Sequence, residues 1–208
     1  QWVNITSTSP ESQTGVGRGV FAGAIPASDT IQYINIASTG DSIDFGNLSE
    51  DRYETEHVSD RTRGVICGGY ESPVRVNKME YITMASTGHA VTFGTLNAAR
   101  GHMSGASNST RGLLAGGQIN PGGSSDITVN IGHITIQTLA SYNDFGDLAT
   151  ARWFAGGGRS NSTRALFAGG GTPAEVNTID YVTISTTGNA GDFGDLTIRA
   201  YGMGSGNA

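Results

Sequence analysis

Phe193-Gly194-Asp195-Leu196 is the last of four copies of the pattern Phe-Gly-x-Leu in a chain of 208 residues. The other copies begin at Phe45, Phe93 and Phe145, so the successive spacings are 48, 52 and 48 residues. A pattern that recurs at a nearly constant period of about 20 to 50 residues is typical of repeat architectures. The tetrapeptide therefore predicts a fold built from four equivalent units.

Three further markers keep the same register. Each unit has a short apolar run led by a basic residue, and these runs begin at Arg18, Arg63, Arg111 and Arg164. A run of β-forming residues follows, beginning at Ile31, Met79, Ile131 and Ile179. An Arg comes shortly after each tetrapeptide, at Arg52, Arg100, Arg152 and Arg199. Four markers in one fixed order indicate a true internal repeat.

The composition favours strands over helices. Gly accounts for 32 residues, roughly twice its average share of about 7 %, and Gly destabilises the interior of a helix. No apolar run approaches the roughly 20 residues of a membrane-spanning helix. The net charge of −6 argues against nucleic-acid binding, and a single Cys excludes an internal disulfide and a Cys-based metal site. We expect an all-β chain that does not insert into membranes.

Each unit reads as four short strands. In the last unit, residues 179–184 alternate β-forming side chains in the manner of a strand buried between neighbours. Four antiparallel strands in about 50 residues are typical of one blade of a β-propeller. The sequence therefore predicts an all-β, four-bladed propeller with four-stranded blades at roughly 17–51, 52–99, 100–151 and 152–198.

The two ends of the repeat region complement each other. Residues 199–207 match the first strand of a unit, and the unit that contains Arg18 lacks that strand. Because an unpaired strand edge exposes a row of backbone groups, we expect residues 199–207 to pair beside residues 18–23 and close the ring. Residues 1–16 are expected to be an N-terminal extension or a partial repeat.

The unit resembles the kelch repeat at its defining points. An Arg precedes the inner strand, a Gly-Gly doublet closes the second strand (Gly68-Gly69, Gly116-Gly117, Gly169-Gly170), and a Tyr lies in the third (Tyr33, Tyr81, Tyr181). It departs from kelch where Phe of the tetrapeptide replaces the usual Trp, where His133 replaces the third-strand Tyr, and where Ala24 replaces the second Gly.

The exact variant is similar to repeats in tail and other virion structural proteins of tailed bacteriophages. The similarity lies in Asn177-Thr178-Ile179-Asp180-Tyr181, which is followed by Asp192-Phe193-Gly194-Asp195-Leu196. The kelch-like resemblance covers residues 17–208. It implies a propeller fold and a place on the virion surface or in the extracellular space.

No residues have the spacing of a catalytic, cofactor or metal site. His57, His89, His102 and His133 fall at four different positions of the repeat, whereas a zinc site needs converging ligands. Cys67 occupies the position of Ala22, Ala115 and Ala168, which predicts a small core residue. The repeated Arg residues are expected to tie carboxylates and carbonyls of adjacent blades together, with an anion-binding ring as the alternative. Their expected partners, which could instead bind Ca²⁺, are Asp44, Asp144, Asp147, Asp192 and Asp195.

The units differ most in the loop between the second and third strands. Four of the five Pro residues lie there, at Pro26, Pro73, Pro121 and Pro173. Variable loops on a constant scaffold often carry recognition, although drift would also make them differ. The segment after the tetrapeptide should reach the same face, where aromatic rings could stack on sugars or pack between blades. The candidate partner- or glycan-binding residues are Tyr70, Glu71, Arg75, Gln118, Asn120, Trp153 and Glu175.

We therefore expect a non-enzymatic virion structural or receptor- and glycan-binding module, such as a bacteriophage tail fibre or decoration protein used in host attachment. Its partners would be other virion proteins, a host surface glycan or receptor, or further copies of the chain. The alternatives are a propeller enzyme, such as a glycosidase or oxidase, and a generic extracellular interaction module. An enzyme would need converging carboxylates or a copper-binding cluster, which the sequence does not suggest.

Overall fold

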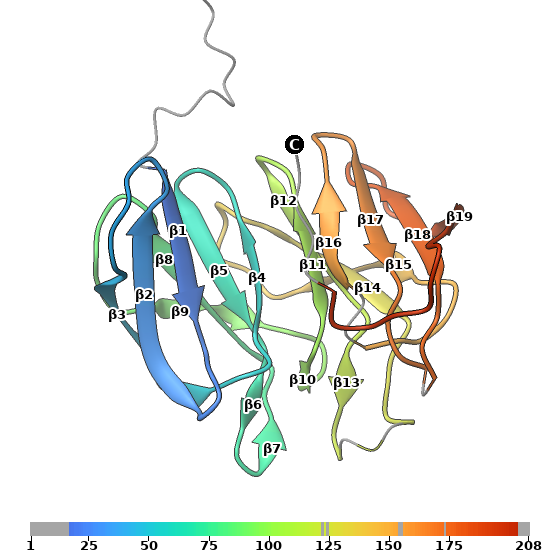
Figure 1. Cartoon of the computed structure of the whole chain (residues 1–208), viewed down its shortest axis with the longest axis horizontal. Coiled ribbons are helices and arrows are strands. Elements are labelled where there is room, and N and C mark those ends of the chain that lie inside the picture. Colours follow the sequence, from blue (N-terminus) through green and yellow to red (C-terminus); the bar gives the residue numbers. More distant parts are fainter. Residues whose placement is uncertain (1–16, 122, 124, 154–155, 173, 204–208) are drawn as a thin grey trace, which may run out of the picture.

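The regular structure of the chain consists of β-strands. A computed structural model describes residues 17–121, 123, 125–153, 156–172 and 174–203. Within these ranges every regular element is a strand (Figure 1). The all-β prediction is confirmed.

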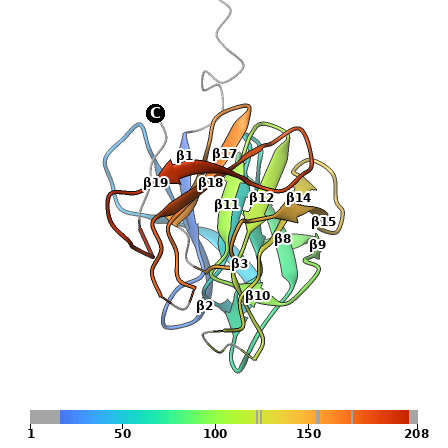
Figure 2. The same cartoon turned by 90° about the vertical axis from the view of Figure 1, so that its right-hand side faces the viewer.

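Three of the units form four-stranded antiparallel sheets with one strand order. The second sheet contains β4 (Glu56–Ser59), β5 (Arg63–Cys67), β8 (Lys78–Thr83) and β9 (Val91–Thr95). The third contains β11 (Ser104–Ser107), β12 (Arg111–Ala115), β14 (Asn130–Thr135) and β15 (Asn143–Asp147). The fourth contains β16 (Gly156–Ser160), β17 (Arg164–Ala168), β18 (Thr178–Thr183) and β19 (Gly191–Asp195), and lies on the side that faces the viewer in Figure 2.

The first sheet has three strands, which are β1 (Arg18–Ala22), β2 (Ser28–Asn35) and β3 (Ile43–Arg52). Strand β1 corresponds to β5, β12 and β17, each of which also pairs with an inner strand. Within the described ranges β1 pairs only with β2. Of the expected closing strand at 199–207, residues 199–203 form no strand, and residues 204–207 lie outside the described residues, as do residues 1–16.

Two small strand pairs extend from the lower end of the molecule in Figure 1. They join β6 (Tyr70–Glu71) to β7 (Val74–Arg75), and β10 (Arg100–Gly101) to β13 (Gln118–Ile119). The Gly-Gly doublets explain their direction. Gly68 has a φ of 58°, and a Cβ on it would lie 2.3 Å from the carbonyl oxygen of Arg100, so only Gly allows this close approach. The doublet thereby turns each loop toward the segment that follows the fourth strand of the same unit.

The core lies between consecutive sheets. Among the described residues it consists of three apolar clusters. In one of them, Phe45 and Leu48 of the first sheet pack with Ile66 and Ile82 of the second. The tetrapeptides at Phe93 and Phe145 do the same for the sheets that follow. The first three Phe-Gly-x-Leu copies therefore supply the apolar contact to the next sheet, which explains why the pattern repeats.

One set of Arg residues links neighbouring sheets through backbone carbonyls. The Nη1 atoms of Arg18, Arg63 and Arg111 donate hydrogen bonds of 2.8, 3.0 and 2.7 Å to the carbonyls of Met84, Ile136 and Ile184. The predicted structural role of these Arg residues is confirmed. The predicted pairing with Asp44, Asp144 and the other acids beside the tetrapeptide is wrong for these three, because a carbonyl takes that place. Asp144 instead accepts a 2.7 Å hydrogen bond from the Asn130 amide.

A second set of Arg residues is almost completely buried. Arg52 forms an ion pair with Glu80, and Arg152 forms one with Asp180. The third sheet has Gly132 at the position of these acids, and Tyr142 fills the space. There the guanidinium of Arg100 lies 4.8 Å from the centre of the Tyr142 ring, which is a cation–π contact.

The expected fourth member of this set, Arg199, is displaced by one residue. The amide of Gly69 donates to the carbonyl of Arg100 at 3.0 Å, and the equivalent bond from Gly170 goes to Ala200 at 2.9 Å. Ala200 therefore occupies the position that Arg fills in the other units. The prediction that Arg199 belongs to this set is wrong, because Arg199 follows the tetrapeptide Leu by three residues, whereas Arg52, Arg100 and Arg152 follow it by four.

Candidate binding face

The segments that carry the predicted binding residues meet at one end of the molecule. Tyr70, Glu71 and Arg75 belong to the β6–β7 hairpin, and Gln118 belongs to β13, which Asn120 closely follows. Trp153 forms a β-bridge with Gly171, which also bridges Glu175. We call this end the loop face, defined by residues 53–54, 70–75, 101–102, 118–120, 153, 171–172, 174–175 and 201. The β6–β7 hairpin and the strand pair β10–β13 mark it at the bottom of Figure 1.

Equivalent backbone bridges build the loop face in three units. Tyr53 pairs with Tyr70, Gly101 pairs with Gln118, and Trp153 pairs with Gly171. The first residue of each pair directly follows a buried Arg. Because each buried guanidinium fixes the backbone beside it, the next side chain is presented at a defined place on the face. The residues at this place are Tyr53, Gly101 and Trp153, so two of the three units present an aromatic ring.

Arg75 joins the loops of the second and third sheets. Its Nη2 lies 3.1 Å from Glu54 Oε2 and also donates to Gln118 Oε1. Its backbone amide donates to Asn120 Oδ1 at 3.0 Å, and the Asn120 amide donates back to the Arg75 carbonyl at 3.1 Å. Arg75 and Gln118 are buried, with 6 % and 8 % of their surface exposed. Both side chains therefore hold the loops in place below the surface.

An aromatic cluster lies beside this network. The ring of Trp153 is centred 5.6 Å from His102 and 5.5 Å from Tyr201. Tyr201 is 50 % exposed, and Glu54 Oε1 lies 3.4 Å from His102 Nε2. Burial and the charge of Arg75 lower the pKa of His102 to about 4, so its imidazole is neutral at pH 7. Burial also raises the pKa of Glu54.

The remaining predicted residues lie around this centre. Tyr70 packs against Tyr53 with 5.2 Å between ring centres, and Arg75 lies 5.6 Å from the Tyr70 ring. Glu71 forms a 2.9 Å ion pair with Lys78, and Glu175 is exposed.

Glu54, His102 and Tyr201 were not predicted as site residues. Their repeat position was the available signal, since Glu54 and His102 each follow a buried Arg by two residues and share a positive φ, of 60° and 54°. The positive φ of His102 lies between β10, which ends at Gly101, and β11, which begins at Ser104.

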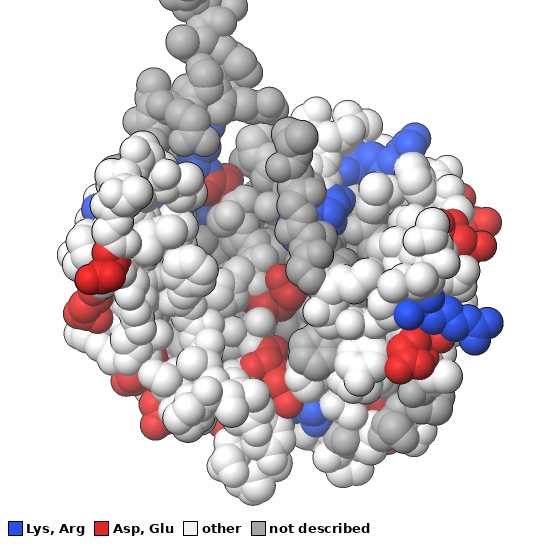
Figure 3. Space-filling view, viewed as in Figure 1, with Lys and Arg blue, Asp and Glu red and all other residues white. Residues whose placement is uncertain are grey.

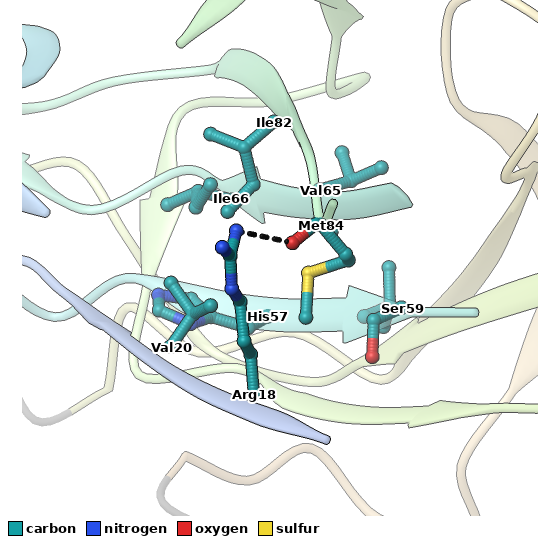
Figure 4. A pocket seen from close by; sticks show the side chains of 10 residues that line it. Arg18, Val20, His57, Ser59, Val65, Ile66, Ile82 and Met84 are labelled. Carbon is teal, nitrogen blue, oxygen red and sulfur yellow. Dashed lines mark hydrogen bonds between the residues drawn. The ribbon is translucent and has the colours of Figure 1, made fainter. Parts of the chain in front are cut away.

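A cavity of about 140 Å³ lies away from the loop face, beside β1 (Figure 4). Arg18 and Val20 line it from one side, and His57, Val65 and Ile82 line it from the second sheet. Burial and the charge of Arg52 lower the pKa of His57 to about 4.

Cys67 is fully buried and burial raises the pKa of its thiol, which confirms it as a core residue. In the part of the chain that the structure describes, no three His, Cys, Asp or Glu side chains are grouped as metal ligands. Figure 3 shows acidic and basic side chains interspersed, without a large basic area on the face in view.

The chain matches no protein-family model and no curated protein. No helix in the described ranges is long and apolar enough to cross a membrane. The function proposed below therefore rests on the geometry of the loop face.

Proposed function

We propose that this protein is a non-enzymatic binding module whose loop face attaches to a glycan on a host cell surface, as part of a virion or another extracellular particle. The observation that supports it is the cluster of Trp153, Tyr201 and His102 beside the carboxylate of Glu54. A ligand site commonly combines apolar and aromatic surface with a few placed polar groups.

The chemistry of the cluster suits a sugar. Aromatic rings offer flat apolar surface at small entropic cost, and Trp and Tyr can also form hydrogen bonds. Glu54 and the neutral His102 supply polar atoms next to those rings. The Arg75 network ties the β6–β7 hairpin to the neighbouring loops before any ligand arrives, and such preorganisation reduces the entropic cost of binding.

We further propose that the four sheets are the blades of a β-propeller and that residues 204–207 provide the missing inner strand beside β1. The course of the chain up to Met203 supports this. A Cβ on Gly169 would meet Leu196, Ala200 and Met203, just as one on Gly68 would meet Leu96, Arg100 and Met103. Since β11 begins directly after Met103, the residues after Met203 would begin the corresponding strand.

The charges at the two ends agree with this arrangement. Buried Arg52 and Arg152 pair with Glu80 and Asp180 in the third strand of the following sheet. The first sheet has Gln32 at that position, as its pairing opposite Asp44 indicates. The segment that would reach it has Ala200 in place of the Arg. The cation and the acid are absent together, so closure would leave no buried charge unpaired.

An array of bacterial lipopolysaccharide O-antigens and capsular polysaccharides tests the binding proposal. We expect the parent to bind at least one glycan, and Trp153→Ala and Tyr201→Ala to bind it at least about tenfold more weakly, as loss of a hot-spot aromatic does. Leu139→Ala is the matched control, because Leu139 is 56 % exposed in the turn between β14 and β15, at the opposite end of the strands. Binding to no glycan, or an equal loss in the control, would overturn the proposal.

A further inference from the structure

The junctions between consecutive sheets share one set of contacts. In each described junction an Arg of one sheet donates to a carbonyl of the next, as Arg63 does to Ile136 and Arg111 does to Ile184. An apolar residue of the next sheet also packs in the same cluster as the tetrapeptide Phe of the sheet before it. Leu114 does so with Phe93, and Phe167 does so with Phe145.

Backbone hydrogen bonds repeat in the same way. The amides of Gly88 and Ala90 donate to the carbonyls of Phe45 and Asn47 at 2.7 and 2.9 Å. The amides of Gly188 and Ala190 donate to Phe145 and Asp147 at 2.7 and 2.8 Å. Between the second and third sheets, the amide of Tyr142 donates to the carbonyl of Thr95 at 3.0 Å. At the three described junctions, the turn before the last strand of one sheet therefore pairs with the last strand of the sheet before it. A Cβ on Gly146 would lie 2.3 Å from the carbonyl oxygen of Gly188, so this approach requires Gly.

The fourth sheet presents the same surface uncovered. Phe193 is 49 % exposed, whereas its equivalents Phe45, Phe93 and Phe145 are 2 %, 3 % and 2 % exposed. A Cβ on Gly194 would meet no described atom within 4 Å. Arg164 is exposed and stacks on Tyr181 of its own sheet at 4.7 Å.

The first sheet presents the complementary surface, also uncovered. Phe21 is 57 % exposed, whereas Ile66, Leu114 and Phe167 at its position are at most 2 % exposed. Ile36 is 69 % exposed, whereas Ile136 and Ile184 at its position are 0 % exposed.

We infer that these two surfaces dock on each other within one chain and form a fourth junction. In it Arg164 donates to the carbonyl of Ile36, and the amides of Gly40 and Ser42 donate to the carbonyls of Phe193 and Asp195. Phe21 and Ile36 then cover Phe193. The inference rests on the propeller arrangement proposed above, and it names the contacts that would complete the ring.

Two arguments select the chain's own first sheet as the occupant. The three junctions between the described sheets have donors, acceptors and apolar residues at the same repeat positions. The partner of the fourth sheet must therefore offer the carbonyl, amide and apolar groups that a sheet of this repeat offers. A partner on the same chain is also present at a high effective concentration. Large uncovered apolar patches are rare on soluble monomers, which favours closure over an open form.

Cysteine cross-linking tests this junction against one that the structure contains. In a Cys67→Ala background, the test pair is Ser42→Cys with Asp195→Cys. The control pair is Ala190→Cys with Asp147→Cys, whose backbones are hydrogen-bonded at 2.8 Å across an existing junction. Both proteins are treated at low micromolar concentration with a short bifunctional thiol reagent and examined by mass spectrometry and size exclusion.

We expect the test pair to cross-link within the monomer to an extent within about twofold of the control. A control that cross-links beside a test pair that does not would overturn the inference. Cross-linking only between chains would also overturn it and would assign the surface to a second copy. If the test pair does not cross-link but the parent binds a glycan, only the inferred junction is refuted. If the test pair cross-links but the parent binds no glycan, only the binding proposal is refuted.

A second measurement does not need new thiols. Arg111→Ala removes the 2.7 Å bond to the Ile184 carbonyl, and Arg164→Ala removes the equivalent bond only if the fourth junction forms. We expect the two variants to lower the melting temperature by similar amounts. An unchanged melting temperature for Arg164→Ala, beside a clear decrease for Arg111→Ala, would overturn the inference.

Discussion

Replacing Arg152 by Ala should destabilise the protein strongly, because it breaks an ion pair inside the core. The Arg152 side chain is 0 % exposed and the Asp180 side chain 2 % exposed. Nη1 of Arg152 also donates to the carbonyls of Gly169 and Thr178 at 3.0 and 3.1 Å. The Ala variant leaves the Asp180 carboxylate buried with the Ala149 amide, at 3.1 Å, as its remaining described partner.

The magnitude follows from the burial of both partners. Removing one member of a buried ion pair typically costs about 3–5 kcal/mol, since the other charge is left uncompensated. For a chain of this size, each kcal/mol lowers the melting temperature by about 2–4 °C. We therefore expect the free energy of unfolding to fall by about 3–5 kcal/mol and the melting temperature to fall by about 10 °C.

Urea denaturation and calorimetry measure both quantities. Lys78→Ala is the matched control, because the Lys78–Glu71 pair is similar in chemistry at 2.9 Å but its Lys is 39 % exposed. Exposed ion pairs contribute about 1 kcal/mol or less. The double variant Arg152→Ala with Asp180→Ala should lose less stability than the sum of the single variants, because neither charge is left alone.

The reasoning would be refuted by an Arg152→Ala protein whose stability equals that of Lys78→Ala. Additive effects of the two single changes would refute it as well, since additivity means that Arg152 and Asp180 do not interact.

Two further predictions concern stability. The first concerns the range between pH 6.5 and 4.5. Because the pKa values of His57 and His102 are lowered to about 4, both side chains stay neutral in the folded protein but become protonated in the unfolded protein, which lowers stability as the pH falls. The pKa of Glu56 is raised to about 7, so this residue has the opposite effect. Together these three groups bind about one more proton in the unfolded state than in the folded state, so their contribution should lower the free energy of unfolding by about 1.4 kcal/mol for each unit by which the pH falls. We expect His102→Asn to flatten this slope in pH-dependent urea titrations. Gly132→Ala would place a Cβ 1.7 Å from Tyr142 Cζ, so calorimetry should show a large loss of melting temperature, partly restored by Tyr142→Ala; a parent-like Gly132→Ala would show that the ring does not fill this space.

The repeat could be predicted from the sequence because its markers perform one physical task in each unit. Phe45, Phe93 and Phe145 all bury against the next sheet, and this demand keeps their spacing constant. The partners of the buried Arg residues could not be predicted, because the third-strand position opposite them holds Gln32, Glu80, Gly132 and Asp180 in turn. Because the residue at this position differs in every unit, the repeat does not indicate which residue contacts the Arg.

The binding face could be predicted only in part for a related reason. Pro-bearing loops and the segment after each tetrapeptide indicated where Tyr70 and Trp153 would lie. Whether a loop side chain reaches solvent depends on the neighbouring loop. Arg75, for example, is buried because it pairs with Glu54. In the last unit the position four residues after the tetrapeptide Leu holds Ala200, and Arg199 lies one residue before it.

Tryptophan fluorescence during a glycan titration tests the binding face directly. The chain has two Trp residues, so Trp2→Phe leaves Trp153 as the sole reporter, between His102 and Tyr201. The titrant is the polysaccharide fragment that the array selects, and calorimetry provides an independent binding curve. We expect the emission of Trp153 to change saturably and with the same dissociation constant. A fragment that binds by calorimetry but leaves this emission unchanged would contradict recognition at the loop face.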